Sequence, residues 1–188
     1  MPRLRTWSLV VLASCVVGLA GCSSSSSTAT TTTASTPTSS TPTSSTAGAP
    51  TAIAVIPVAD RSPAGQSGTA PTIVVPSGTP PTQLESADLI TGTGATAQAG
   101  DSVTVQYVLA TYSSGKEIQS SWTSQPFTFA LGEGQVIKGW DEGVVGMKVG
   151  GRRELIIPPS LGYGAKSPGS GIAANDTLVF IVDLLKIN

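Results

Sequence analysis

The stretch VIKGWDEGVVGMKVGGRRELIIPPSLGYG, residues 136–164, decides the fold, because it predicts a short helix followed by a strand. Trp140, Val144 and Met147 follow the i, i+4, i+7 spacing of one helix face, which predicts a helix over residues 137–146. Two glycines inside this segment weaken an isolated helix. The helix is therefore expected to be held by packing against a sheet.

Alternating strand patterns flank this helix. Residues 152–157 alternate between two faces, and the strand stops at Pro158-Pro159 because proline cannot donate to a β-ladder. Further strands are predicted at residues 101–112, 127–131 and 177–187, the last of which is the most apolar and is expected at the centre of the sheet, with weaker candidates at 72–75 and 83–90. The predicted fold class is α+β, an antiparallel β-sheet of about five strands wrapped around one short α-helix.

Reactive side chains are scarce in this chain. It contains no histidine, and its two cysteines, Cys15 and Cys22, lie close to the N-terminus. Asp141 and Glu142 fall in the first turn of the predicted helix, where carboxylates complement the helix dipole, so we interpret them as helix-start residues and not as an acid–base pair. An activity that needs no nucleophile, metal or cofactor, and that uses an apolar pocket, is the expectation.

The N-terminus is typical of an exported protein. Arg3 and Arg5 precede an apolar run that is too short to span a bilayer, which predicts a signal peptide over residues 1–21. The sequence Leu19-Ala20-Gly21-Cys22 resembles a bacterial lipobox, which predicts lipidation of Cys22 and anchoring at the extracytoplasmic face of the cell membrane. The alternative is an ordinary signal peptide with an incidental cysteine.

A Ser/Thr/Ala/Pro-rich segment separates the predicted anchor from a domain at residues 71–188. Residues 22–70 are interpreted as a disordered tether, because this composition buries too little apolar area to offset chain entropy. Within it, IAVIPV at residues 53–58 is either a strand or docking segment or an apolar patch of linker, and the flanking Pro and Gly favour the linker. O-glycosylation of the tether is left open.

The charge of the exported chain excludes nucleic acid as an expected partner. Removing Arg3 and Arg5 with the leader leaves eight of the ten Lys and Arg residues against eleven Asp and Glu residues, a net charge of about −3. Phosphate neutralisation needs a basic face, which eight scattered cations do not make. Arg152 and Arg153 form the one adjacent pair of cations after the leader, and they are interpreted as solvated residues at the start of a strand.

Five ordered motifs between residues 82 and 187 resemble the FKBP-type peptidyl-prolyl cis-trans isomerases. The motifs are GKEI (115–118), PFTF (126–129), VIKGWDEG (136–143), LGYG (161–164) and TLVF (177–180). The resemblance implies a proline-sized pocket with Trp140 as its floor. Its implied walls are Tyr107, Phe127, Val136, Ile137, Tyr163 and Phe180.

The resemblance also assigns individual roles within that pocket. The Ile137 backbone N–H and the Tyr163 hydroxyl are the implied hydrogen-bond donors, and Ile172 is the implied aliphatic residue at the pocket edge. Without the resemblance, ordinary core packing would explain each aromatic residue equally well.

Two positions depart from the family pattern and bear on the rate and the sequence preference. Ile118 stands where phenylalanine is common, and Gln119 replaces a frequent aspartate. The loop at residues 171–174, Gly-Ile-Ala-Ala, is expected to be more flexible than the Ile-Pro-Pro style loop. The short interval between Gly164 and Thr177 leaves no room for the inserted flap of chaperone-type relatives, so holdase activity is not expected.

The function expected from the resemblance is isomerisation of X-Pro bonds in exported proteins or peptides, without a cofactor or a metal. Macrolides are expected as inhibitors, and the protein is expected to be a monomer. Twisting the bond removes amide resonance, and a dry pocket favours the less polar twisted state. One alternative is a weakly catalytic or non-catalytic module that binds proline peptides or another surface. A purely structural spacer is a third interpretation.

Overall fold

The computed structural model describes residues 53–188, so the predicted signal peptide, the lipidation site Cys22 and the tether through residue 52 lie outside the described residues. Two 3-10 turns, η1 (Val58–Asp60) and η2 (Pro159–Leu161), and one helix, α1 (Lys138–Gly143), occur in this part of the chain. Its strands are β1 (Ala54–Val55), β2 (Glu85–Ile90), β3 (Ser102–Thr111), β4 (Glu117–Ser120), β5 (Phe127–Ala130), β6 (Arg152–Ile157) and β7 (Leu178–Ile187).

The strands form one sheet in the order β1-β2-β6-β7-β3-β4, with β5 also paired to β3. Every pairing is antiparallel except that of β1 with β2. The apolar strand β7 lies between β6 and β3, as its composition predicts. The predicted α+β fold class is confirmed. The structure adds the short strand β4 to the predicted set, and β1 lies in the segment 53–58 for which a strand was one of the alternatives.

The predicted strand at residues 72–75 is wrong. These residues form no ladder in the structure. Pro71 and Pro76 flank them and cannot donate to a neighbouring strand. Ile73 and Val75 still pack against buried residues of the sheet, which accounts for their apolar character.

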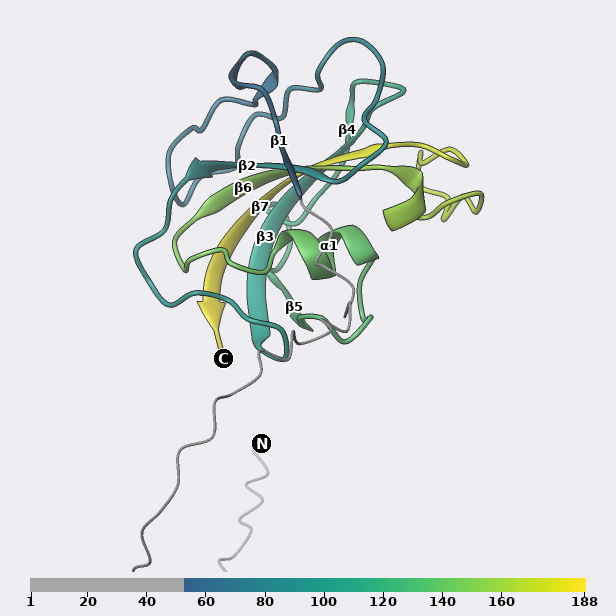
Figure 1. Ribbon diagram of the computed structural model, residues 1–188. Coiled ribbons are helices and arrows are strands. Elements are labelled where there is room, and N and C mark those ends of the chain that lie inside the picture. The colour runs from purple at the N-terminus through teal and green to yellow at the C-terminus, as the bar shows by residue number, and fades with distance from the viewer. Residues whose placement is uncertain (1–52) are drawn as a thin grey trace, which may run out of the picture. The chain divides into compact units, whose positions relative to one another are not determined.

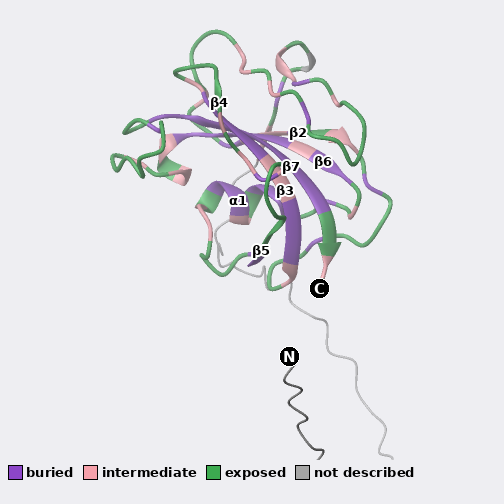
Figure 2. Cartoon of the chain, turned by 180° about the vertical axis from the view of Figure 1, so that it is seen from behind, coloured by how far each residue is buried: buried purple, intermediate pink, exposed green. Residues whose placement is uncertain are grey.

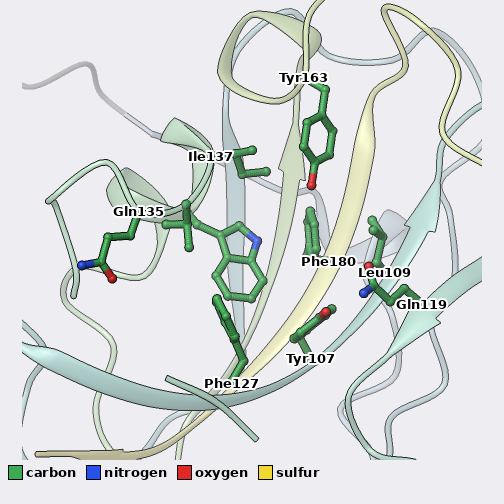
Figure 3. Close-up of a pocket in the computed structure, with 10 residues that line it drawn as sticks. Tyr107, Leu109, Gln119, Phe127, Gln135, Ile137, Tyr163 and Phe180 are labelled. Atoms are coloured by element: carbon green, nitrogen blue, oxygen red, sulfur yellow. The ribbon is translucent and has the colours of Figure 1, made fainter. Parts of the chain in front are cut away.

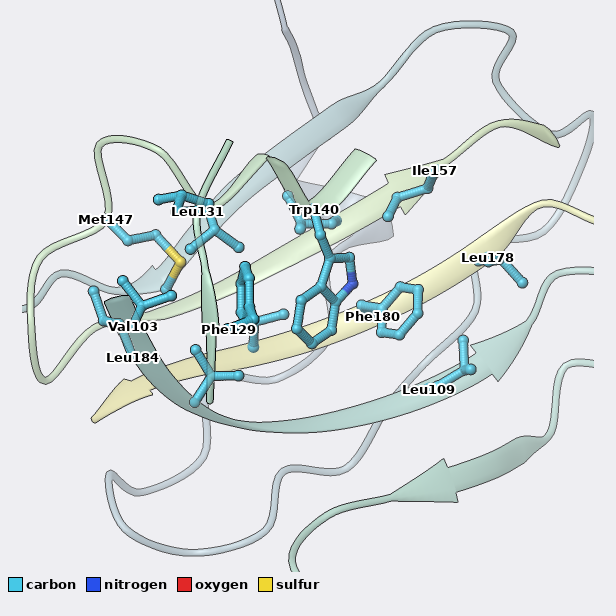
Figure 4. Packing of buried hydrophobic residues seen from close by; sticks show 14 of the residues in the cluster. Val103, Leu109, Phe129, Leu131, Trp140, Met147, Ile157, Leu178, Phe180 and Leu184 are labelled. Atoms are coloured by element: carbon cyan, nitrogen blue, oxygen red, sulfur yellow. The ribbon is translucent and has the colours of Figure 1, made fainter. Parts of the chain in front are cut away.

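The sheet curves around α1, and the main core lies between them (Figures 1 and 4). Trp140, Val144 and Met147 are all buried in this core, as their spacing predicts. The helix approaches β6 so closely that a Cβ at Gly139 or Gly143 would overlap a side chain of that strand. The helix ends at Gly143, three residues before the predicted end, because the chain turns away towards Gly146, which has a φ of 82°.

A segment that we call the N-terminal strap, residues 53–76, packs on the side of the sheet opposite α1 (Figure 1). Its β1 pairs with β2 in parallel, and Ile56 is fully buried with Ala87, Ile156 and Val179. The interpretation of residues 53–70 as tether is therefore wrong, and the alternative of a strand or docking segment is correct. The apolar side chains of IAVIPV have a matching apolar surface on the sheet, which composition alone does not reveal.

The interpretation of Arg152 as a solvated residue is also wrong. Arg152 is 1% exposed, because β6 is an interior strand whose outer face is covered by the strap. Strands β3 and β7 at the centre of the sheet are likewise coloured mostly as buried (Figure 2). The guanidinium of Arg152 pairs with Asp183 on β7. Arg153 points to the other face, where its Nε donates to Asp88 at 2.6 Å.

Within residues 53–188, no helix is long and apolar enough to cross a membrane.

Candidate active site

A cavity of about 400 Å³ opens between α1 and strands β3, β4, β5 and β7 (Figure 3). Its lining contains aromatic, aliphatic and amide side chains but no Asp, Glu, Lys or Arg. The lining residues are Tyr107, Leu109, Gln119, Phe127, Gln135, Val136, Ile137, Trp140, Tyr163 and Phe180. Such a cavity can bind and desolvate a small apolar group.

The register of β4, β3 and β7 places three of these residues side by side. Leu109 on β3 stands opposite Gln119 on β4 and also opposite Phe180 on β7. Tyr107 lies two residues before Leu109 and so shares its face of β3. Long-range strand pairing therefore builds one wall of the cavity.

Trp140 lies at the bottom of the cavity and is 4% exposed. Its ring meets Tyr107 and Phe180 edge-on, with centroid distances of 5.3 and 5.2 Å and interplanar angles of 82° and 81°. Phe129 packs against it from the core side at 5.5 Å. Aromatic pairs in such T-shaped contacts are favourable beyond their buried area, so these contacts stabilise the position of the indole in an apolar floor.

Phe127 and Tyr163 stand at the mouth of the cavity, where they are 41% and 39% exposed. The phenol of Tyr163 comes from the turn after η2, and its hydroxyl points into the cavity (Figure 3). These two side chains are free to contact a larger ligand that extends beyond the floor.

The lining residues that carry hydrogen-bond donors include Ile137, through its backbone amide, and Tyr107 and Tyr163, through their hydroxyls. Ile137 precedes the first helical residue in an extended conformation (φ −63°, ψ 147°), and its amide has no acceptor among residues 53–188. Burial, and then the neighbouring Tyr163, raise the pKa of Tyr107 above its ordinary value of 10.0. Tyr107 therefore stays protonated at neutral pH.

The loop that leads into Ile137 is held by a carboxylate of α1. Asp141 accepts the backbone N–H groups of Gly132 at 2.9 Å and Gly134 at 3.0 Å. Both glycines have positive φ, 81° and 69°, which their lack of a Cβ permits. Asp141 thus does more than complement the helix dipole, since it ties the cavity wall to the helix that carries the floor.

The structure brings eight of the ten predicted site residues into the cavity lining, but not Ile118 and Ile172. Ile118 is half-buried and packs against the core, and Ile172 is buried in that core. Their side chains are used in packing the strand and loop beside the cavity. Sequence reasoning missed Leu109, which the two-residue spacing from Tyr107 could have indicated, and Gln135, for which the sequence holds no clear signal.

Residues 53–188 contain no group of three or more His, Cys, Asp or Glu side chains placed to hold a metal ion.

Comparison with known proteins places the chain in a family. The model of the FKBP-type peptidyl-prolyl cis-trans isomerase domain matches residues 94–185. An FK506-binding protein of Streptomyces anulatus is 50% identical over 119 residues, which are 62% of this chain and 96% of that protein. The chain belongs to the FKBP-type peptidyl-prolyl cis-trans isomerase family, and it is an isomerase of this type.

Two further comparisons agree with this assignment. A probable FK506-binding protein of Corynebacterium glutamicum is 45% identical over 116 residues, covering 61% of this chain and 96% of that protein. The crystal structure of AtFKBP13 superposes with a TM-score of 0.52 and 33% identity, covering 58% of this chain and 96% of that one. The sheet wrapped around one helix is thus the fold of this family.

Proposed function

We propose that this isomerase acts on X-Pro bonds of exported proteins, by desolvating and twisting the bond over Trp140. The observation that carries the proposal is the uncharged aromatic cavity of about 400 Å³, which has an indole floor and polar donors in its lining. Its size suits a proline ring with its flanking atoms.

The reaction requires rotation about one bond and no covalent step. The barrier of roughly 18–20 kcal/mol comes from resonance, which places negative charge on the carbonyl oxygen of the planar amide. Twisting the bond removes that charge separation, so an apolar cavity without formal charge, from which the bound substrate displaces water, disfavours the planar state relative to the twisted one. Ile137 N–H and Tyr163 O–H hold the substrate carbonyls that flank the twisting bond.

The names of the relatives suggest a ligand for the same cavity. Both bacterial relatives are called FK506-binding proteins. We propose that macrolides of this kind also bind the cavity, where they compete with proline peptides for contact with Trp140.

The proposed location of the protein and the proposed class of its substrate proteins are argued from the N-terminal sequence. The signal-like run and Cys22 support a lipid-anchored monomer at the extracytoplasmic face of the cell membrane, where it meets exported proteins. Labelling of the expressed chain with a radioactive fatty acid, lost in Cys22→Ala and retained in Cys15→Ala, tests this part of the proposal.

A second candidate function is a proline-peptide binding module with little turnover. The observation that favours it is Gln119, an amide in the lining where the family frequently has an aspartate. An amide alters the field at the substrate carbonyl without closing the cavity.

A protease-coupled assay with an X-Pro tetrapeptide separates the two functions. The full-length chain should accelerate isomerisation, and Trp140→Leu and Tyr163→Phe should each lower kcat/KM, with FK506 as a competitive inhibitor. Tyr112→Phe is the matched control, because Tyr112 lies outside this cavity. Tight FK506 binding without any turnover would favour the binding module.

A further inference from the structure

The N-terminal strap lies outside residues 94–185, the part of the chain that the family model matches. Its contacts with β6 connect it to the part of the chain that the model does match. They converge on β6, which runs between β2 and β7. Alternate side chains of this strand point to opposite faces of the sheet, so β6 has a strap face and a helix face.

The strap face of β6 is bound through Ser62. Glu154 is fully buried, and its two carboxylate oxygens accept the backbone N–H of Ser62 at 2.9 Å and the Ser62 hydroxyl at 2.6 Å. The same hydroxyl oxygen accepts the N–H of Val74 at 2.9 Å. Ser62 therefore joins the middle of the strap and, through Val74, its C-terminal end to one carboxylate of β6.

Arg152 binds the strap at two further points on the same face. Its Nη1 donates to the carbonyl oxygen of Ala64 at 2.7 Å, and its Nη2 donates to that of Thr69, also at 2.7 Å. Ile56 of the strap adds an apolar contact with Ile156. The strap thus contacts Arg152, Glu154 and Ile156, the three alternate side chains of this face.

Helix α1 packs on the helix face of β6. Arg153 Nη1 donates to the carbonyl oxygens of Gly143 at 2.8 Å and Val145 at 3.0 Å, where the helix ends. A Cβ on Gly143 would lie 2.7 Å from the side chain of Leu155. A Cβ on Gly139 would likewise overlap the side chain of Ile157. Helix α1 carries Trp140, so the position of β6 sets the position of the floor.

We propose that the N-terminal strap is a positioning element of the isomerase site, which braces β6 from outside so that α1 and Trp140 stay seated on its inner face. This inference rests on the proposed function, because its kinetic consequence is measured as isomerisation of X-Pro peptides. It assigns to Ser62 and Glu154 an effect on catalysis without contact with the substrate.

The test uses Ser62→Ala in the full-length chain, with Ser77→Ala as a matched control at an exposed serine. Both variants are assayed well below their unfolding temperatures, so that loss of folded protein does not contribute. Couplings of this kind amount to roughly 2- to 30-fold in an equilibrium or rate, and we expect kcat/KM of Ser62→Ala to fall by about 3- to 10-fold. Ser77→Ala should match the wild type.

Hydrogen exchange gives a readout that does not depend on turnover. The amides of Val144 and Met147, which donate to the carbonyl oxygens of Trp140 and Val144, should exchange faster in Ser62→Ala than in Ser77→Ala. Ile56→Val, a milder loosening of the strap, should shift exchange and kcat/KM in the same direction and covers the case in which Ser62→Ala does not fold.

Two negative outcomes are distinguishable. If the strap variants lower only the melting temperature, while kinetics and exchange at α1 equal those of Ser77→Ala, the strap is merely structural and the inference is wrong. If the wild-type chain does not accelerate isomerisation, the proposed function fails, and exchange at α1 still decides whether the strap positions the helix.

Discussion

Arg152 and Asp183 stand directly opposite each other on β6 and β7, and they form a buried two-pronged ion pair. Nε donates to Oδ1 at 2.6 Å and Nη2 donates to Oδ2 at 2.7 Å. Carbonyl oxygens of the strap accept two further hydrogen bonds, so four of the five guanidinium hydrogens have acceptors although the charge is removed from water. The neighbouring Arg153 instead pairs with Asp88, whose side chain is 45% exposed.

Removing one partner of the buried pair should be costly. We expect Asp183→Asn to lower the free energy of unfolding by about 3–5 kcal/mol, because it leaves an uncompensated buried cation. Asp88→Asn breaks a partly exposed pair, in which the Arg153 side chain is 12% exposed and the Asp88 side chain 45%, and should cost about 1 kcal/mol. Urea unfolding of the two variants measures the difference, and equal losses would contradict the assignment of Arg152 as a buried ion-pair residue.

Glu154 should make stability depend on pH. Burial raises the pKa of Glu154 above its ordinary value of 4.5, although the hydrogen bonds from Ser62 act in the opposite direction. The folded chain then binds this proton more tightly than the unfolded chain, so the free energy of unfolding declines as pH rises from 4.5 through the folded pKa. Urea unfolding across this range should show the decline in the wild type and a weaker one in Glu154→Gln. A difference between the two proteins that does not vary with pH would count against the raised pKa.

Asp141 should affect activity more than its exposed neighbour does. Asp141→Ala removes the acceptor for two loop amides, so the loop that leads into Val136 and Ile137 loses its tie to α1. We expect kcat/KM to fall by about 10-fold, because a small displacement of a positioning group is costly in rate. Glu142→Ala, one residue along the helix, is the control and should stay within about 2-fold of the wild type. Peptide-assay kinetics at one temperature compare them, and equal rates in both variants would remove the positioning role of Asp141.

The rate of isomerisation should be nearly independent of pH. No Asp, Glu, Lys or Arg lines the cavity, and the pKa of Tyr107 lies above 10.0. A pH profile of kcat/KM reports essential acids and bases of the free enzyme, so it should be flat between about pH 5.5 and 9. A bell-shaped profile over this range would show that an ionisable group outside the described lining takes part.

Elements with strong local periodicity were predictable. The strand β3 and the buried face of α1 follow from spacing, because each pattern has an apolar face that must be covered. The central position of β7 follows from its composition, because a strand apolar on both faces must be covered on both. Strand β4 was not predicted, since Glu117–Ser120 is short and mostly polar. It pairs with β3 as a hairpin, with Ala110 opposite Glu117, but its own residues form no apolar face that would mark a strand.

Most of the cavity lining followed from the family resemblance, and the exceptions have a physical reason. Ile118 and Ile172 lie beside the cavity but point into the core. A motif gives the position of a residue along the chain, whereas the direction of its side chain depends on the local twist and register of the strand. Register also brings Leu109 into the lining, opposite Gln119 and Phe180.

Composition and pattern were enough to establish the fold class, the scarcity of reactive groups and the apolar character of the site, because all three depend on which residues occur and how they are spaced. They did not indicate that Arg152 and Glu154 are buried or that residues 53–76 belong to the folded domain. A charged side chain can be buried only where partners from distant segments satisfy its hydrogen bonds. Those partners, Ser62, Ala64, Thr69 and Asp183, meet β6 only in the tertiary structure.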